Sequence, residues 1–144
     1  MEPSALAGIT TFVLHKVAVA SRRAIADQLA ARHNLTLWQF AALVELEAHG
    51  PVAQNVVAAG LGMDPSDMVR LMDELIERRV VSRERDTTDR RRYKIALTAK
   101  GRRLLAAAQD VVRETEQATL APLTARERAT LHTLATRVYL DLSR

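Results

Sequence analysis

The hydrophobic pattern of this chain departs from the helical period in one segment, residues 81–97, and this departure limits the possible folds. Before and after the segment, apolar residues recur every three or four positions, as on one face of a helix. Inside it the side chains alternate, so that Tyr93, Ile95 and Leu97 share one face of a strand. The polar run DTTDRRR, residues 86–92, separates two such strands. The segment therefore predicts a β-hairpin with a basic tip in a mainly α chain.

A clearly delimited helix is predicted immediately before the hairpin, at residues 64–79. Asp64 can cap its N-terminus, and Pro65 suits the first helical position, where a backbone N–H would have no helical partner. Apolar residues from Met68 to Ile76 repeat at helical spacing and predict a buried face. The residues expected on the opposite, exposed face are Pro65, Ser66, Val69, Arg70 and Asp73.

Three helices are expected in the first 62 residues. Residues 4–34 have the pattern of one long helix whose apolar stripe is longer than a small body can cover, so either the core or a partner subunit could bury it. A capping box of Thr36 and Gln39 predicts the start of the second helix, and a Gly-Pro pair its end. A short third helix is expected within residues 53–62.

Two more helices are expected after the hairpin. Thr98 is a plausible N-cap for a helix over residues 99–120, and Thr124 with Glu127 forms a capping box for the final one. Three consecutive helices followed by a two-stranded ribbon form a winged helix-turn-helix, which places its last helix in the DNA major groove.

The distribution of charge supports a polyanionic partner. The net charge is +4, but residues 78–103 hold eleven Lys or Arg against three acidic residues, and the remainder is net acidic. A mildly acidic body with one strongly basic segment indicates a localised contact with a polyanion such as DNA.

The exposed side chains of the 64–79 helix have the chemistry needed to recognise base edges. Ser66 can donate or accept a hydrogen bond, Arg70 suits guanine or phosphate, and Val69 can contact a thymine methyl group. At the hairpin tip, Arg90, Arg91 and Arg92 could place one guanidinium in a narrow minor groove and the others on phosphates. Asp89 could hold one arginine through a charge-assisted pair.

Other classes of site have little support in the sequence. The chain contains no cysteine, which excludes disulfides, thiolate metal sites and cysteine-based redox sensing. The four histidines lack metal-ligand spacing, and we find no clustered acid/base set, so no metal, cofactor or catalytic residue is predicted. The amino terminus lacks a secretory pattern, and no apolar run approaches the ~20 residues of a membrane span. We therefore expect a cytoplasmic protein.

The sequence DRRRYKIALTAKG resembles the wing signature of the MarR family, the multiple-antibiotic-resistance type of bacterial transcription regulators. That family has an Asp-x-Arg pair at the wing tip, which falls here on Asp89 and Arg91, and a strand ending in Leu-Thr-x-x-Gly, which falls on Leu97, Thr98 and Gly101. LTLWQFAALVEL and GLGMDPSDMVRLMDELIERRVVSRERD are also similar, so the resemblance covers nearly the whole chain.

This resemblance implies a homodimer of triangular outline, in which terminal helices interlock. It implies a single domain over residues 1–144, with the winged helix-turn-helix at about 35–98 and dimerisation helices at about 4–34 and 99–144. The family binds pseudo-palindromic operators on double-stranded DNA, usually as repressors. Many members release DNA when a small, often aromatic or phenolic, effector binds between the dimer region and the reading domain.

Trp38 and Phe40 lie on the helix that, by resemblance, faces this effector cleft. The alternative is that Phe40 is a core residue, stapled to Leu35, and Trp38 a partly exposed neighbour. For the chain as a whole, the alternative to a regulator is a winged-helix module that binds an acidic protein surface instead of specific DNA.

Two positions depart from the family pattern. Arg79 stands where the family usually has a glycine that ends the recognition helix, so either this arginine is left-handed, at a cost of about 1 kcal/mol, or the helix ends differently. Ala53 stands where Ser or Thr commonly caps the short helix, so one capping hydrogen bond is expected to be missing.

Overall fold

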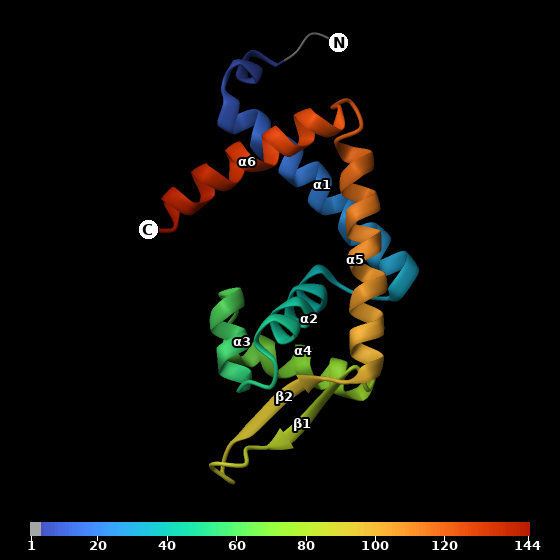
Figure 1. Ribbon diagram of the computed structural model, residues 1–144, viewed down its shortest axis with the longest axis vertical. Coiled ribbons are helices and arrows are strands. Elements are labelled where there is room, and N and C mark those ends of the chain that lie inside the picture. Colours follow the sequence, from blue (N-terminus) through green and yellow to red (C-terminus); the bar gives the residue numbers. More distant parts are fainter. Residues whose placement is uncertain (1–3) are drawn as a thin grey trace.

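The computed structural model describes residues 4–144, so residues 1–3 of the predicted domain lie outside the described part (Figure 1). The chain is mainly helical with one two-stranded antiparallel sheet, as predicted. In chain order the elements are η1 (Ala5–Gly8), α1 (Thr10–His33), α2 (Leu37–His49), α3 (Gln54–Leu61), α4 (Pro65–Glu77), β1 (Val81–Arg85), β2 (Tyr93–Leu97), α5 (Ala99–Thr119) and α6 (Ala125–Leu142).

The prediction of one unbroken helix over residues 4–34 is wrong at its N-terminal end. Residues Ala5–Gly8 form a separate 3₁₀ turn, and Ile9 is extended, with φ −100° and ψ 110°. The α-helix begins only at Thr10. Glycine and β-branched residues cluster at this break and have low helix propensity. The Ser4 hydroxyl also accepts a hydrogen bond from the Leu6 N–H at 3.2 Å, which favours a local turn.

The predicted starts of α2, α4, α5 and α6 are confirmed by their caps. The Thr36 hydroxyl accepts from the Gln39 N–H at 3.1 Å, and the Gln39 side chain accepts from the Thr36 N–H at 3.0 Å. The same reciprocal pair opens α6, and single side-chain caps open α4 and α5. Ala53 gives α3 no side-chain cap, as expected. Each cap satisfies N–H groups that the first turn leaves unpaired.

Helix α4 ends in a Schellman motif built around Arg79. This residue has φ +60°, so the first of the two alternatives for it is the correct one. The Arg79 N–H bonds the Ile76 carbonyl at 2.9 Å, and the Val80 N–H bonds the Leu75 carbonyl at 3.2 Å. Leu75 and Val80 are both fully buried, which supplies the apolar contact that accompanies this motif. An arginine is therefore held in a conformation that favours glycine.

The hairpin has the predicted strands and is fixed to the body by a third segment. Val81 pairs with Leu97 and Arg85 with Tyr93. Val52, in the loop before α3, exchanges two backbone hydrogen bonds with Ile95, at 2.8 and 3.1 Å. Ile95 is 1% exposed. These contacts hold the base of the ribbon against the helices and leave its tip free to project (Figure 1).

The buried core lies at the wing-bearing end of the molecule and includes the central part of α5. Its buried members come from α1, α2, α3, α4, the hairpin and α5. The largest fully buried side chains are Leu29, Leu35, Leu43, Leu46, Val57, Met68, Met72, Leu75, Val80, Val81, Ile95 and Leu105. This core fixes α4 and the hairpin as one unit.

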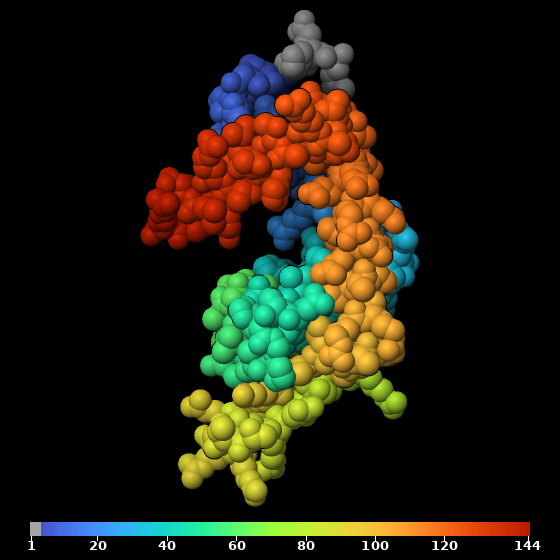
Figure 2. Space-filling view, in the orientation of Figure 1, coloured from blue at the N-terminus to red at the C-terminus, as the bar shows by residue number. Residues whose placement is uncertain are grey.

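The other end of the molecule is open. Helix α6 has no buried residue, and α1 contributes only Leu29 to the core. Leu134, Val138 and Leu142 on α6 are 49%, 60% and 81% exposed. The space-filling view shows a hollow between α6 and the α2–α3 region (Figure 2). Most of the apolar stripe predicted for residues 4–34 is therefore uncovered in a single chain.

Candidate nucleic-acid interface

Helix α4 presents the predicted exposed face. Its core side is buried through Met68, Met72 and Leu75, each with no accessible surface. On the other side, Val69 is 48% exposed, and the Arg70 side chain is 76% exposed. The five residues predicted for this side, Pro65, Ser66, Val69, Arg70 and Asp73, are all exposed, and Glu77 at the end of α4 is exposed beside them.

The N-terminus of α4 is held by a compact hydrogen-bond pair. Asp64 Oδ1 accepts from the Ser66 N–H at 2.8 Å and from the Ser66 hydroxyl at 2.5 Å. The hydroxyl bond, followed by the backbone bond, holds the pKa of Asp64 below its ordinary value of 3.8. Because its proton is donated to Asp64, the Ser66 hydroxyl has only its lone pairs free, so it is an acceptor toward any partner in front of the helix.

Two aspartates of α4 are paired with basic side chains. Asp67 Oδ1 lies 3.1 Å from Arg70 Nη2, and Asp73 Oδ1 lies 3.6 Å from Arg83 Nη2 on β1. Arg83 also donates to the Gln54 side chain at 3.3 Å. These pairs reduce the negative potential of α4 toward a polyanion.

Sequence reasoning did not identify Arg83 as part of this surface. The available signal was the strand alternation, which puts Arg83 on the same face as the buried Val81 and therefore toward the helices. Its partners come from α3 and α4, which the strand pattern alone could not show.

Two aspartates shape the tip of the wing. Asp86 Oδ1 accepts from the N–H and the hydroxyl of Thr88, at 3.0 and 2.9 Å. Asp89 Oδ1 accepts from the Arg91 N–H at 3.0 Å, and the Asp89 carbonyl accepts from the Arg92 N–H at 3.0 Å. The tip is thus a hydrogen-bonded turn, and these bonds fix the backbone conformation from which its arginine side chains extend.

The three arginines of the tip are exposed, and they differ in whether their guanidinium groups form an ion pair. Arg92 Nε lies 3.7 Å from Asp89 Oδ2, a loose ion pair. The guanidinium groups of Arg90 and Arg91 have no ion-pair partner within residues 4–144. Asp89 therefore orients the backbone at Arg91 and the side chain of Arg92, and two guanidinium groups are available for a ligand.

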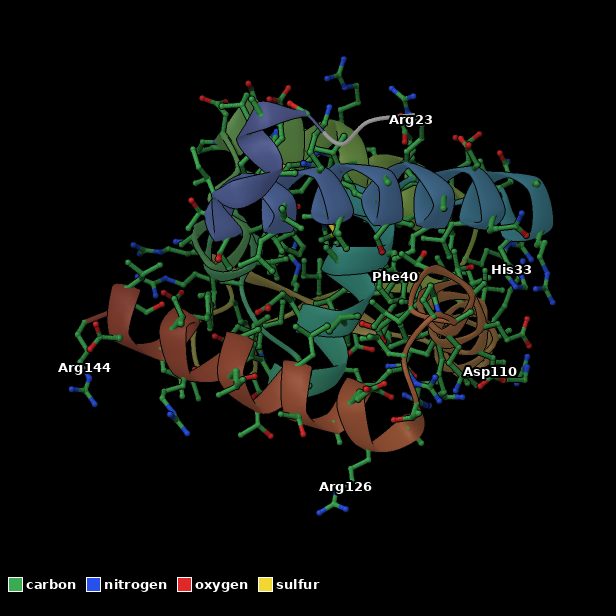
Figure 3. The ribbon with its side chains drawn as sticks, turned by 90° about the horizontal axis from the view of Figure 1, so that it is seen from above. Arg23, His33, Phe40, Asp110, Arg126 and Arg144 are labelled. Carbon is green, nitrogen blue, oxygen red and sulfur yellow. The ribbon has the colours of Figure 1, made fainter. Side chains whose placement is uncertain are left out.

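Trp38 and Phe40 border a cavity of about 430 Å³ between α1 and α2. Trp38 is 45% exposed, while Phe40 packs against the core. In the view from above, Phe40 lies between the ribbons of α1 and α6 (Figure 3). Sequence reasoning missed Arg22 and Glu45, which bring the only charges to a lining otherwise made of Leu37, Trp38, Phe40, Ala41, Val44 and Leu61.

The described residues contain neither a metal-binding cluster nor a membrane-spanning helix. No group of three or more His, Asp or Glu side chains within residues 4–144 could hold a metal ion. None of the helices in that range combines the length and apolarity needed to cross a bilayer.

The sequence profile of the MarR family matches residues 33–92, which contain α2, α3, α4, β1 and the wing tip. The chain is 30% identical over 125 residues to the HTH-type transcriptional repressor NicR of Pseudomonas putida, covering 85% of this chain and 79% of NicR. The chain belongs to the MarR family. It is therefore a DNA-binding transcription regulator, and the family is one of regulators and not of enzymes.

Solved structures of transcription regulators share this fold. A probable transcriptional regulator from Pseudomonas aeruginosa is 31% identical, with a TM-score of 0.75 over 92% of this chain and 98% of that one. A mutant MarR from E. coli, solved in complex with operator DNA, is 23% identical, with a TM-score of 0.73 over 94% and 99% of the two chains. The winged helix-turn-helix predicted from the sequence is confirmed.

Proposed function

We propose that this MarR-family protein is a repressor that binds a pseudo-palindromic operator as a homodimer. The observation that best supports DNA binding is the exposed face of α4, which lies beside a wing tip whose arginines are also exposed. A helix of this size fits the major groove, where Arg70 can bond guanine or phosphate and Val69 can contact a thymine methyl group. The Ser66 hydroxyl can accept a hydrogen bond from an adenine or cytosine amino group, and Pro65 lies beside it.

In this proposal the wing enters the adjacent minor groove. Arg91 is the best placed to insert, because its backbone is fixed by Asp89 at 3.0 Å while its guanidinium is unpaired within residues 4–144. Arg90 and Arg92 would contact phosphates on either side. A narrow A·T-rich groove has an enhanced negative potential that attracts such side chains. Asp89 contributes by orienting the tip.

The uncovered helices at the open end supply the proposed dimer interface. Monomeric proteins rarely expose large contiguous apolar patches, and here Leu134 and Val138 on α6 are about half exposed or more, as are Leu6 and Ile9 before α1. A second copy related by a twofold axis could cover all of them. We therefore assign residues 4–34 and 99–144 to dimerisation and about 35–98 to DNA binding.

We also propose that the cavity beside Trp38 and Phe40 receives a small aromatic or phenolic effector. Its volume of about 430 Å³ is in the range of small-molecule sites, and its lining is largely apolar. It lies between α1 of the proposed dimer region and α2 of the reading domain, so an occupant could alter their relative position. The protein would act in the cytoplasm without catalysing a reaction.

Selection from a pool of genomic fragments tests the DNA-binding proposal, and footprinting upstream of the protein's own gene complements it. We expect enrichment of one inverted repeat whose half-sites are about one helical turn apart, because both reading helices must meet one face of the duplex. A winged-helix module that binds acidic protein surfaces would enrich no repeat. That result would overturn the proposal.

A further inference from the structure

Arg78, the residue that follows α4, reaches across to the C-terminal end of α1. Its Nη1 donates to the Asn34 carbonyl at 2.7 Å, and its Nη2 donates to the His33 carbonyl at 2.9 Å. The two partners lie more than 40 positions earlier in the sequence. Figure 3 shows His33 at the end of α1, beside α5. The Arg78 side chain therefore links the C-terminal end of α4 to the C-terminal end of α1.

The chemistry of this contact suits a firm link. The last carbonyls of a helix have no helical partner and carry the negative end of its dipole, so a guanidinium is a favourable ligand for them. Asn34 is left-handed, with φ +50°, and ends α1 directly beside the contact. Two charge-assisted bonds from one planar group fix direction as well as distance.

Other contacts hold the same end of α4 from its remaining sides. The Thr98 hydroxyl donates to the Arg79 carbonyl at 2.7 Å, and Lys100 Nζ donates to the Arg78 carbonyl at 3.0 Å. On α2, Gln39 Nε2 donates to Glu74 Oε2 at 2.8 Å. The Arg78 side chain is the member of this set that reaches α1.

We propose that Arg78 is a positioning residue for operator recognition, which fixes α4 relative to α1 and thereby sets the separation of the two reading helices. The inference rests on the proposed function, because it requires a dimer held together by the terminal helices. In such a dimer α1 belongs to the dimerisation region, and α4 belongs to the part that contacts DNA. A link between them determines which half-site spacing fits.

A direct phosphate contact by Arg78 does not fit its placement. Arg78 is nine positions after Val69, which is half a turn around the helix axis, so the two residues lie on opposite sides of α4. Two donors of its guanidinium are occupied by the α1 carbonyls. The proposal therefore predicts that substitution of Arg78 changes the spacing preference and leaves every phosphate contact in place.

The experiment compares binding of the wild type and Arg78→Gln to the inverted repeat selected by the wild type. The probes carry half-sites moved one or two base pairs closer together or further apart, and one probe carries a single half-site. One base pair rotates a half-site by about 35°, so the wild type should lose at least about tenfold in affinity per step. Arg78→Gln should lose less than about threefold per step, with single-half-site affinity within about twofold of the wild type.

Two further variants keep the test decisive. Arg32→Gln is the matched control, since Arg32 also lies at the end of α1 but pairs with Glu114 on α5 at 3.0 Å. It should keep the wild-type spacing profile. Arg78→Lys retains the charge with a single ammonium group. Its loss of affinity per step in half-site spacing should lie between those of the wild type and Arg78→Gln. If Arg78→Gln does not fold, as judged by circular dichroism, the Arg78→Lys profile decides.

The outcomes separate the possible roles of Arg78. A lowered melting temperature with an unchanged spacing profile would mean that Arg78 only stabilises the fold, and would overturn the proposal. So would a reduced dependence of affinity on salt, which would indicate that Arg78 itself binds a phosphate. If the wild type selects no inverted repeat, the proposed function fails and the inference with it.

Discussion

The carbonyl oxygen of Val80 occupies the space that a side chain on Gly101 would need. A Cβ built on Gly101 would lie 2.0 Å from that oxygen and 2.9 Å from its carbon. The same carbonyl accepts a hydrogen bond from the Thr98 N–H at 3.1 Å. The first turn of α5 thus packs directly on the backbone between α4 and the wing. This contact gives a physical reason for the glycine in the Leu-Thr-x-x-Gly pattern.

Gly101→Ala should lower the free energy of unfolding by about 3 kcal/mol, because the new methyl group meets backbone that cannot rotate away. Urea denaturation followed by circular dichroism measures the change. Gly8→Ala is the matched control, since a Cβ there has no atom within 4 Å. Equal effects of the two substitutions would mean that the Val80 contact is unimportant.

Arg79→Gly should raise the free energy of unfolding by about 1 kcal/mol, because glycine adopts the left-handed conformation without the clash of a Cβ. Chemical denaturation again provides the measurement. Asn34→Gly offers a comparison at the other left-handed position, and its gain should be smaller since asparagine tolerates this region. A destabilised Arg79→Gly protein would contradict the expectation.

Arg91→Ala should weaken operator binding by about 1–3 kcal/mol if the guanidinium inserts in the minor groove. The slope of log affinity against log salt should also fall by roughly one unit for each phosphate that the variant no longer neutralises. Fluorescence anisotropy at several salt concentrations gives both quantities. Arg126→Ala should change neither, because Arg126 lies in the first turn of α6, at the opposite end of the molecule from the wing (Figure 1). An unaltered affinity and slope for Arg91→Ala would remove the wing from the interface.

The stability of the fold should fall as the pH drops below 3.8, in part through Asp64. The Ser66 hydroxyl and N–H hold the pKa of Asp64 below this ordinary value in the folded protein. A group with a depressed folded pKa stabilises the fold above its unfolded pKa, and the contribution is lost as the pH falls through the folded pKa. Melting temperatures between pH 6 and 3 should therefore fall less in Asp64→Asn, which keeps a capping oxygen but does not titrate. Identical pH profiles would count against this role.

Val138→Asp should weaken self-association by about 2 kcal/mol, because it places a charge on the exposed apolar surface of α6 that the proposed dimer would bury. Light scattering over a dilution series measures the equilibrium. Val56→Asp on α3 is the control, since Val56 is 48% exposed but lies outside the terminal helices. Unchanged association in Val138→Asp would place the interface elsewhere.

Local sequence signals predicted most of the elements of this fold. Capping residues such as Thr36 and Asp64 act within three positions of their partners, so the sequence predicts them directly. The exposed face of α4 followed from helical periodicity, and the strands from alternation. The break before Thr10 was missed because the apolar stripe continues through it, although Gly8 and Ile9 weaken the helix there.

Long-range contacts account for what the sequence did not predict. Arg83 reaches Asp73 and Gln54, and Arg78 reaches the end of α1, only because packing brings distant segments together. The bridge between Val52 and Ile95 has the same origin. Periodicity assigns each of these side chains to a face but not to a partner. The chemistry of the wing was therefore predictable, whereas the links that fix it to the body were not.

The absence of any buried residue in α6 has a consequence for how the protein matures in a cell. If a second copy covers this helix, the last stage of acquiring structure is an encounter between two molecules, and its rate rises with the square of the concentration of newly made chains. A regulator expressed at a few copies per cell would then become active slowly. The onset of repression after a burst of synthesis would be set by pairing and not by translation.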